Sequence, residues 1–213
     1  MQLKLPQLSM LYHMLQNNIL TLSGWSQDSA AFNEALALQA RAFDYLQQPI
    51  NTAFNDIAAA DVIIGWSLGG QLAIKLCTKL KPKLLVLLAT PKKFVNDASY
   101  KIGMDAEIFA NFVNNFGKDT EGTLQKFKFL ICQNDQYAKN ILKKLILSNS
   151  NYAEQWLHEL ATNDLCEYDF SNLPPTLIIH GLNDQLVNYQ QAELLQQKIP
   201  QAKLTILKKA AHA

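Results

Sequence analysis

The sequence has few cysteines and no long hydrophobic run. Its three cysteines, Cys77, Cys132 and Cys166, stand far apart and form no C-x-x-C pair. A disulfide framework and a zinc site are therefore not expected, and we expect free thiols in a reducing compartment. No apolar run approaches the roughly 18 residues that a membrane span needs. The first 15 residues lack the basic start and clean apolar stretch of a secretory signal peptide.

An excess of charge of one sign is also lacking. The 19 basic and 18 acidic residues leave a formal net charge of +1. This balance gives no reason to expect nucleic acid or an anionic membrane as a partner. The chain has 213 residues, of which 49% are apolar. This length and composition suit one packed domain spanning residues 1–213, and we expect a cytoplasmic monomer.

The chain instead contains short apolar runs that alternate with helical patterns. This order predicts an α/β fold with a mostly parallel central sheet between helices. The expected strands cover residues 18–23, 40–46, 61–65, 83–89, 176–181 and 202–207. The expected helices cover residues 28–39, the segment after residue 67 as far as Pro82, and residues 189–198.

A segment of different character interrupts this alternation. Residues from about 92 to 170 contain no long β-branched run and have helical patterns with Asn-rich joints. Pro174 and Pro175 mark the return to the sheet. We expect a helical insertion that forms a lid over one end of the sheet.

The segment Gly65-Trp66-Ser67-Leu68-Gly69 fits the pattern G-x-S-x-G between an expected strand and an expected helix. In this arrangement a serine occupies a tight, strained turn, and the two glycines let neighbouring backbone come close. The turn exposes the hydroxyl and places the N–H of Leu68 beside it, where it can stabilise an oxyanion. Ser67 is therefore predicted to be a nucleophile.

A serine nucleophile needs a base, and the base needs a carboxylate to orient it. His212 follows the last expected strand, and Asp184 follows the strand at residues 176–181. Parallel strands would bring both to the edge that carries Ser67, in the chain order Ser, Asp, His of the α/β hydrolases. His180 could also reach the site, but packing beneath the neighbouring loop is the favoured interpretation.

The loop after the first strand, Ser23-Gly24-Trp25-Ser26, should supply the second oxyanion donor. We expect this donor to be the N–H of Trp25. Chemistry by a serine, a histidine and an aspartate requires no metal and no organic cofactor, so none is expected.

Three segments carry a family resemblance: Gly65–Gly70 (GWSLGG), Gly24-Trp25, and Lys209–Ala213 (KAAHA). Together they resemble the pimeloyl-[acyl-carrier-protein] methyl ester esterases of biotin synthesis, which have an α/β-hydrolase fold. The resemblance implies a serine carboxylesterase that removes a methyl group from pimeloyl-acyl-carrier-protein methyl ester. It also implies a substrate-binding part for Trp25, lid lysines that hold the acidic carrier protein, and a lid aromatic that lines the acyl channel. By position these are Lys126, Lys139, Lys143 and Phe127, although exposed helix lysines have the same pattern.

The chain departs from the family in three places. Ser23 replaces the family's usual histidine before Gly-Trp, so the oxyanion loop needs different support. The segment 40–60 lacks the usual Gly-rich turn, so that edge of the sheet should be trimmed. The sequence ends one residue after His212, where the family continues with an apolar loop and a helix. We therefore expect the His212 loop to be weakly held.

Other functions remain open at this stage. A general short-chain carboxylesterase or lipase would share the three catalytic residues but ignore a carrier protein. A cofactor-free haloperoxidase or a C–C hydrolase would share the fold. A non-catalytic binding protein is a further alternative, favoured by the abrupt end after His212 and opposed by the complete set of Ser, Asp and His.

Overall fold

The computed structural model describes residues 18–147 and 149–213. The N-terminal features considered above, including the expected lack of a signal peptide, lie outside these residues. The described chain forms a six-stranded sheet in the order β2-β1-β3-β4-β5-β6, in which every neighbouring pair is parallel. The predicted α/β class with a parallel sheet is therefore confirmed. The strands are β1 (Ile19–Leu22), β2 (Arg41–Ala42), β3 (Val62–Trp66), β4 (Leu84–Leu88), β5 (Thr176–Gly181) and β6 (Lys203–Leu207).

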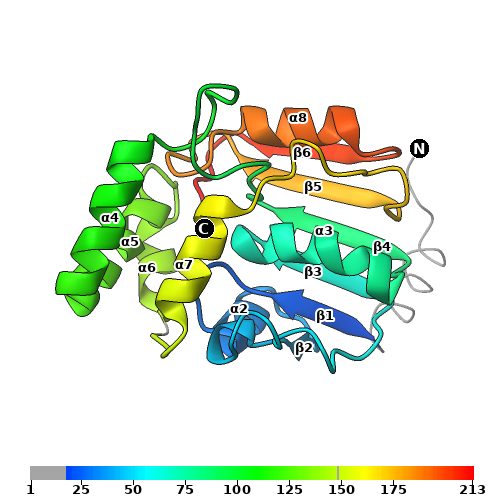
Figure 1. Cartoon of the computed structure of the whole chain (residues 1–213), viewed down its shortest axis with the longest axis horizontal. Helices are drawn as coiled ribbons and strands as arrows, with labels where there is room; N and C mark the ends of the chain where they lie inside the picture. Colours follow the sequence, from blue (N-terminus) through cyan, green and yellow to red (C-terminus); the bar gives the residue numbers. More distant parts are fainter. Residues whose placement is uncertain (1–17, 148) are drawn as a thin grey trace.

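One face of this sheet is closely packed. Helix α3 (Leu68–Leu80) lies against β1, β3 and β4, and helix α8 (Gln190–Lys198) lies against β5 and β6 (Figure 1). The strand residues on this face, among them Ile63, Leu85, Leu87 and Ile178, are fully buried. Their burial explains why β3 and β4 are near-continuous apolar runs, as is usual in parallel sheets.

The opposite face is covered less completely. Helix α2 (Ser29–Ala35) packs there, and the ring of Phe32 stacks on Trp66 with centroids 5.6 Å apart. Beyond α2, alternate residues of β4 and β5 are only half-buried, and Leu207 on β6 is 45% exposed. An apolar hollow therefore remains over part of this sheet face.

The segment between β4 and β5 contains the helices α4 (Ala106–Lys118), α5 (Thr120–Cys132), α6 (Ala138–Lys144) and α7 (Ala153–Thr162). They gather at one end of the sheet (Figure 1). Asp105 caps α4 through hydrogen bonds from Glu107 N and Ile108 N, and Asp119 caps α5 through one from Gly122 N. These capping residues set where the helices begin.

Two elements are shorter than the sequence predicts. Helix α2 ends at Ala35, because Ala37 adopts a left-handed backbone conformation with φ of 51°. The expected strand at 40–46 is reduced to Arg41–Ala42, and a 3-10 turn, η1 (Tyr45–Gln47), follows it. The Tyr45 hydroxyl donates to Ser23 O at 2.8 Å, which draws the chain beneath the sheet edge and ends the pairing.

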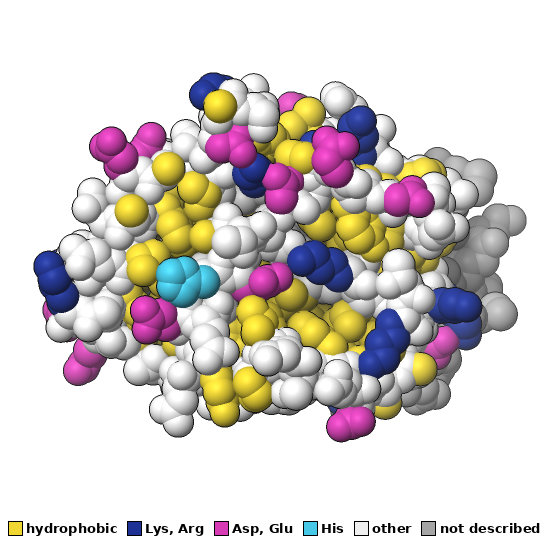
Figure 2. Space-filling view, in the orientation of Figure 1, with side chains coloured by type: hydrophobic (Ala, Val, Ile, Leu, Met, Phe, Trp, Pro, Cys, Tyr) yellow, Lys and Arg dark blue, Asp and Glu magenta, His cyan; other side chains and the backbone are white. Residues whose placement is uncertain are grey.

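Positive and negative side chains are interspersed over the face shown in Figure 2. This distribution agrees with the net charge of +1. Within residues 18–147 and 149–213, no helix is long and apolar enough to cross a bilayer.

Candidate active site

Ser67 occupies a strained turn between β3 and α3. Its backbone angles are φ 55° and ψ −120°, which a non-glycine residue rarely adopts. The glycines on either side permit the turn: a Cβ on Gly65 would lie 2.5 Å from Gly69 O, and a Cβ on Gly69 would lie 2.3 Å from Leu22 O. The predicted strand–turn–helix geometry around Ser67 is therefore present.

Asp184 and His212 meet at the same edge of the sheet. His212 Nδ1 lies 2.8 Å from Asp184 Oδ2, although the residues are 28 positions apart. Both side chains are almost fully buried. The other carboxylate oxygen, Oδ1, accepts hydrogen bonds from the N–H groups of Leu186 and Val187, at 2.9 and 2.8 Å. The loop after β5 thus fixes the carboxylate, and the carboxylate fixes the imidazole.

Several opposing effects act on the pKa of Asp184. Burial raises it, whereas the charge of His212 and hydrogen bonds from His180 and His212 lower it. The lowering effects prevail, so the pKa lies well below its usual range and the carboxylate is ionised at neutral pH. An ionised carboxylate can stabilise an imidazolium at His212.

His180 is a second imidazole on the same carboxylate. Its Nε2 lies 2.8 Å from Val187 O and 3.1 Å from Asp184 Oδ2, and its side chain is fully buried. A carbonyl oxygen can only accept, so Nε2 carries a proton. The sequence interpretation of a histidine packed beneath the loop captured its burial but missed its contact with Asp184. The sequence signal that could have revealed this contact is the spacing H-x-x-x-D, which brings His180 and Asp184 to one tight turn.

His212 is also held through its backbone. The residue before Ser67, Trp66, donates its indole N–H to His212 O at 2.9 Å. Among the described residues, no hydrogen bond joins the Ser67 hydroxyl to His212. Such catalytic contacts often form only when substrate is bound.

The expected oxyanion loop lies directly against Ser67. A Cβ on Gly24 would approach Ser67 Cβ to 3.4 Å. Ser23 replaces the family's histidine, and its hydroxyl donates to Gln27 O at 2.9 Å inside the loop. Within residues 18–147 and 149–213, neither Trp25 N–H nor Leu68 N–H, the predicted donors, is engaged in a backbone hydrogen bond. Both remain available for an oxyanion.

The Trp25 side chain connects this loop to the helical insertion. Its indole N–H donates to Ala153 O at 2.9 Å. Its ring makes edge contacts with Phe112, Phe116 and Phe127, at centroid distances of 5.6, 5.2 and 5.3 Å. Phe127, the predicted channel residue, is thus buried with its ring against that of Trp25.

The predicted carrier-binding lysines lie on neighbouring helices. Lys126 is on α5, and Lys139 and Lys143 are on α6. All three are exposed, and none forms a salt bridge within the part of the chain that the structure describes. Lys126 borders a shallow groove that also includes Phe129, Ala138 and Leu142. Lys126 thus lies beside apolar side chains of α5 and α6.

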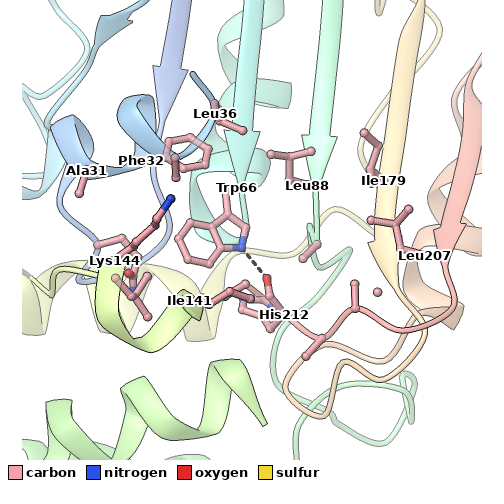
Figure 3. Close-up of a pocket in the computed structure, with 18 of the residues that line it drawn as sticks. Ala31, Phe32, Leu36, Trp66, Leu88, Ile141, Lys144, Ile179, Leu207 and His212 are labelled. Carbon is pink, nitrogen blue, oxygen red and sulfur yellow. Dashed lines mark hydrogen bonds between the residues drawn. The ribbon is translucent and has the colours of Figure 1, made fainter. Parts of the chain in front are cut away.

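The apolar hollow on the open sheet face reaches the base from the other side. It has a volume of about 370 Å³. Trp66 and His212 lie at its centre, with Phe32 of α2 and Leu36, the residue after α2, on one side and Leu88, Ile179 and Leu207 from the strands on another (Figure 3). His212 and the indole of Trp66 therefore both line the hollow.

The described residues contain no group of three or more His, Cys, Asp or Glu side chains arranged to hold a metal ion. Cys77 and Cys132 are buried thiols, and Cys166 is partly exposed. Burial raises the pKa of Cys77 to about 12 and that of Cys132 to about 11. Both thiols are therefore protonated at neutral pH and poor nucleophiles.

A family described as "alpha/beta hydrolase fold" matches residues 43–213. The chain belongs to this family. It is 30% identical over 181 residues to a protein of Nitrosomonas europaea named pimeloyl-[acyl-carrier protein] methyl ester esterase, covering 81% of this chain and 72% of that relative. It is 32% identical over 187 residues to the biotin biosynthesis bifunctional protein BioHC of Teredinibacter turnerae, covering 80% of this chain and 33% of the relative. An esterase of the first name from Nitrosospira multiformis is 29% identical, and the chain spans 61% of its length.

Solved structures agree on the α/β-hydrolase fold. An esterase from Exiguobacterium antarcticum superposes with a TM-score of 0.71 at 19% identity, over 92% of this chain and 84% of that one. A bromoperoxidase from Bacillus anthracis gives 0.70 at 17% identity, over 92% and 85%. The resemblance noted in the sequence to the pimeloyl-[acyl-carrier-protein] methyl ester esterases is thus supported by curated relatives, and the fold by solved structures.

Proposed function

We propose that this α/β hydrolase is a serine carboxylesterase that cleaves pimeloyl-acyl-carrier-protein methyl ester to pimeloyl-acyl-carrier protein and methanol. The observation that carries the proposal is the 2.8 Å contact between His212 Nδ1 and Asp184 Oδ2, at the sheet edge where Ser67 occupies its strained turn. The names of the curated relatives support the choice of substrate. We propose that the reaction is cytoplasmic and belongs to biotin synthesis, a role that the printed name of the Teredinibacter turnerae relative supports.

In the first half of the reaction, Ser67 Oγ attacks the ester carbonyl carbon and its proton passes to His212 Nε2. Asp184 stabilises the imidazolium. The N–H groups of Trp25 and Leu68 hold the oxyanion, and losing one such donor raises the barrier by roughly 3 kcal/mol. The tetrahedral intermediate then collapses, the C–O bond to the methoxy group breaks, and His212 protonates the departing methanol.

The second half repeats these roles with water. His212 takes a proton from water, the resulting hydroxide attacks the acyl-enzyme carbonyl, and Ser67 leaves with the proton of His212. No cofactor takes part in either half.

Recognition of the carrier protein is the part of the proposal that separates it from a general esterase. The exposed lysines Lys126, on α5, and Lys139 and Lys143, on α6, suit an acidic carrier by their charge. We propose that Phe127 and Trp25 then border the path of the acyl chain toward Ser67, because their rings are in contact beside the oxyanion loop.

The test compares pimeloyl-acyl-carrier-protein methyl ester with p-nitrophenyl butyrate, for the wild-type chain and Ser67→Ala. Reversing the charge of Lys126, Lys139 and Lys143 to Glu should raise KM for the carrier substrate and leave that for the small ester unchanged. Lys198→Glu, an exposed lysine on α8, is the matched control. Ser67-dependent cleavage of the small ester alone would support a general carboxylesterase instead.

A further inference from the structure

The loop that carries His212 is held by the helical insertion. This differs from the sequence expectation of a weakly held loop. The end of α5 and the joint between α5 and α6, together residues 131–137, lie against residues 209–213. Gln136 N donates to Lys209 O at 3.0 Å, and Ala213 N donates to Ile131 O at 3.2 Å. Two backbone hydrogen bonds thus connect the two segments on either side of the base.

Asp135 makes the connection closest to the base. Its Oδ2 accepts a hydrogen bond from Ala211 N, the residue before His212, at 2.9 Å. Its Oδ1 accepts one from Tyr137 N at 2.6 Å within the joint itself. A single half-buried carboxylate therefore fixes both its own turn and the backbone of the base loop.

The same joint also reaches the loop that carries the acid. Asn183 Nδ2 donates to Asn134 O at 3.2 Å, one residue before Asp184. Residues 134 and 135 thus contact the neighbours of both Asp184 and His212. The loop after β5 adds a backbone contact of its own, since Asn183 N donates to Ala210 O at 3.0 Å.

We propose that Asp135 is a positioning residue for the base His212, a role that rests on the proposed function. Asp135 holds the backbone on one side of His212 through Ala211 N, and Trp66 holds the His212 carbonyl on the other. Asp184 holds the imidazole itself, at Nδ1. A hydrogen bond from N–H to a carboxylate is stronger than one to a neutral acceptor, so Asp135 is well suited to this part.

Three variants test this role by steady-state kinetics on p-nitrophenyl butyrate. Asp135→Ala should lower kcat roughly 10- to 100-fold with KM within about twofold, because misplacing a catalytic group by about 1 Å has this effect. Asp135→Asn keeps one oxygen acceptor and should recover part of the loss. Asp119→Ala is the matched control, since Asp119 also accepts a backbone N–H in the insertion, at 2.9 Å, but caps only its own helix.

A second measurement does not depend on activity. Amide hydrogen exchange should show faster exchange at Ala211–Ala213 in Asp135→Ala and unchanged exchange there in Asp119→Ala. Equal kcat in wild type and Asp135→Ala, with Ser67→Ala inactive, would overturn the positioning role and leave the proposed function intact. A wild-type chain that cleaves no ester would overturn the proposed function, and unchanged exchange at Ala211 would then overturn the contact as well.

Discussion

Trp66 and His212 are joined by a hydrogen bond from the indole N–H of one to the carbonyl oxygen of the other, at 2.9 Å. The residue before Ser67 therefore holds the backbone of His212, the proposed base. This arrangement couples the turn at Ser67 to the last residues of the chain, 146 positions away in sequence.

Replacing Trp66 by Phe should separate this contact from simple packing. The variant keeps an aromatic ring against Phe32 but leaves the His212 carbonyl without its donor, so we expect kcat on p-nitrophenyl butyrate to fall roughly tenfold. Trp156→Phe is the control, because Trp156 is also buried and donates to Gln48 O at 3.0 Å rather than to His212. Loss of a hydrogen bond should cost each variant about 1 kcal/mol of stability. Equal kcat in the two variants would show that the contact does not position the base.

His180→Ala should weaken both the fold and the reaction. It removes one of the two imidazoles on Asp184 and leaves Val187 O without its partner in a buried position. An orphaned buried acceptor costs about 1–3 kcal/mol, measured by chemical unfolding. We expect kcat to fall as well, because Asp184 loses a contact that orients it. His158→Ala, at an exposed position on α7, should change neither quantity.

The lowered pKa of Asp184 predicts a pH dependence of stability. A carboxyl group whose pKa is lower in the folded state contributes stability above its unfolded pKa of about 3.9. That contribution is lost as the pH falls through the still lower folded value. The difference in unfolding free energy between wild type and Asp184→Asn should therefore be largest near pH 7 and shrink below pH ~4. A difference that does not change between pH 7 and pH 3 would contradict the ionised carboxylate.

Two glycine substitutions should have opposite effects. Gly69→Ala would place a Cβ 2.3 Å from Leu22 O and 2.4 Å from Ser23 O, so backbone would have to move and both stability and activity should fall. A Cβ at Gly117, on α4, would meet nothing within 4 Å. Gly117→Ala should therefore stabilise the chain by up to about 1 kcal/mol, because alanine has a higher helix propensity than glycine. Thermal unfolding of both variants tests the comparison; a stable, active Gly69→Ala would show that the turn tolerates a side chain.

The sheet and the three candidate catalytic positions could be predicted because they depend on local patterns. Apolar runs marked the strands, and G-x-S-x-G between a strand and a helix marked Ser67. Parallel strands then required Asp184 and His212 to meet at one edge. The contact of His180 with Asp184 was missed, because the burial of a strand-end histidine does not reveal its partner.

The support of the base loop could not be predicted for a different reason. It depends on Asp135 and Ala211, which are 76 positions apart and carry no shared pattern. The incomplete cover of one sheet face, and the placement of the joint between α5 and α6, arise from the packing of whole elements. The early end of α2 depends on the left-handed conformation of Ala37. An alanine within a helical pattern gives no sequence signal for that conformation.

The central claim is that Ser67 is a nucleophile activated by His212 and Asp184. The most direct measurement is covalent labelling with a fluorophosphonate, read by intact mass and by the mass of the peptide containing Ser67. We predict one adduct per chain, on Ser67, with none in Ser67→Ala and a rate reduced by several orders of magnitude in His212→Ala. An adduct on another residue, or labelling that is unchanged in His212→Ala, would contradict the account.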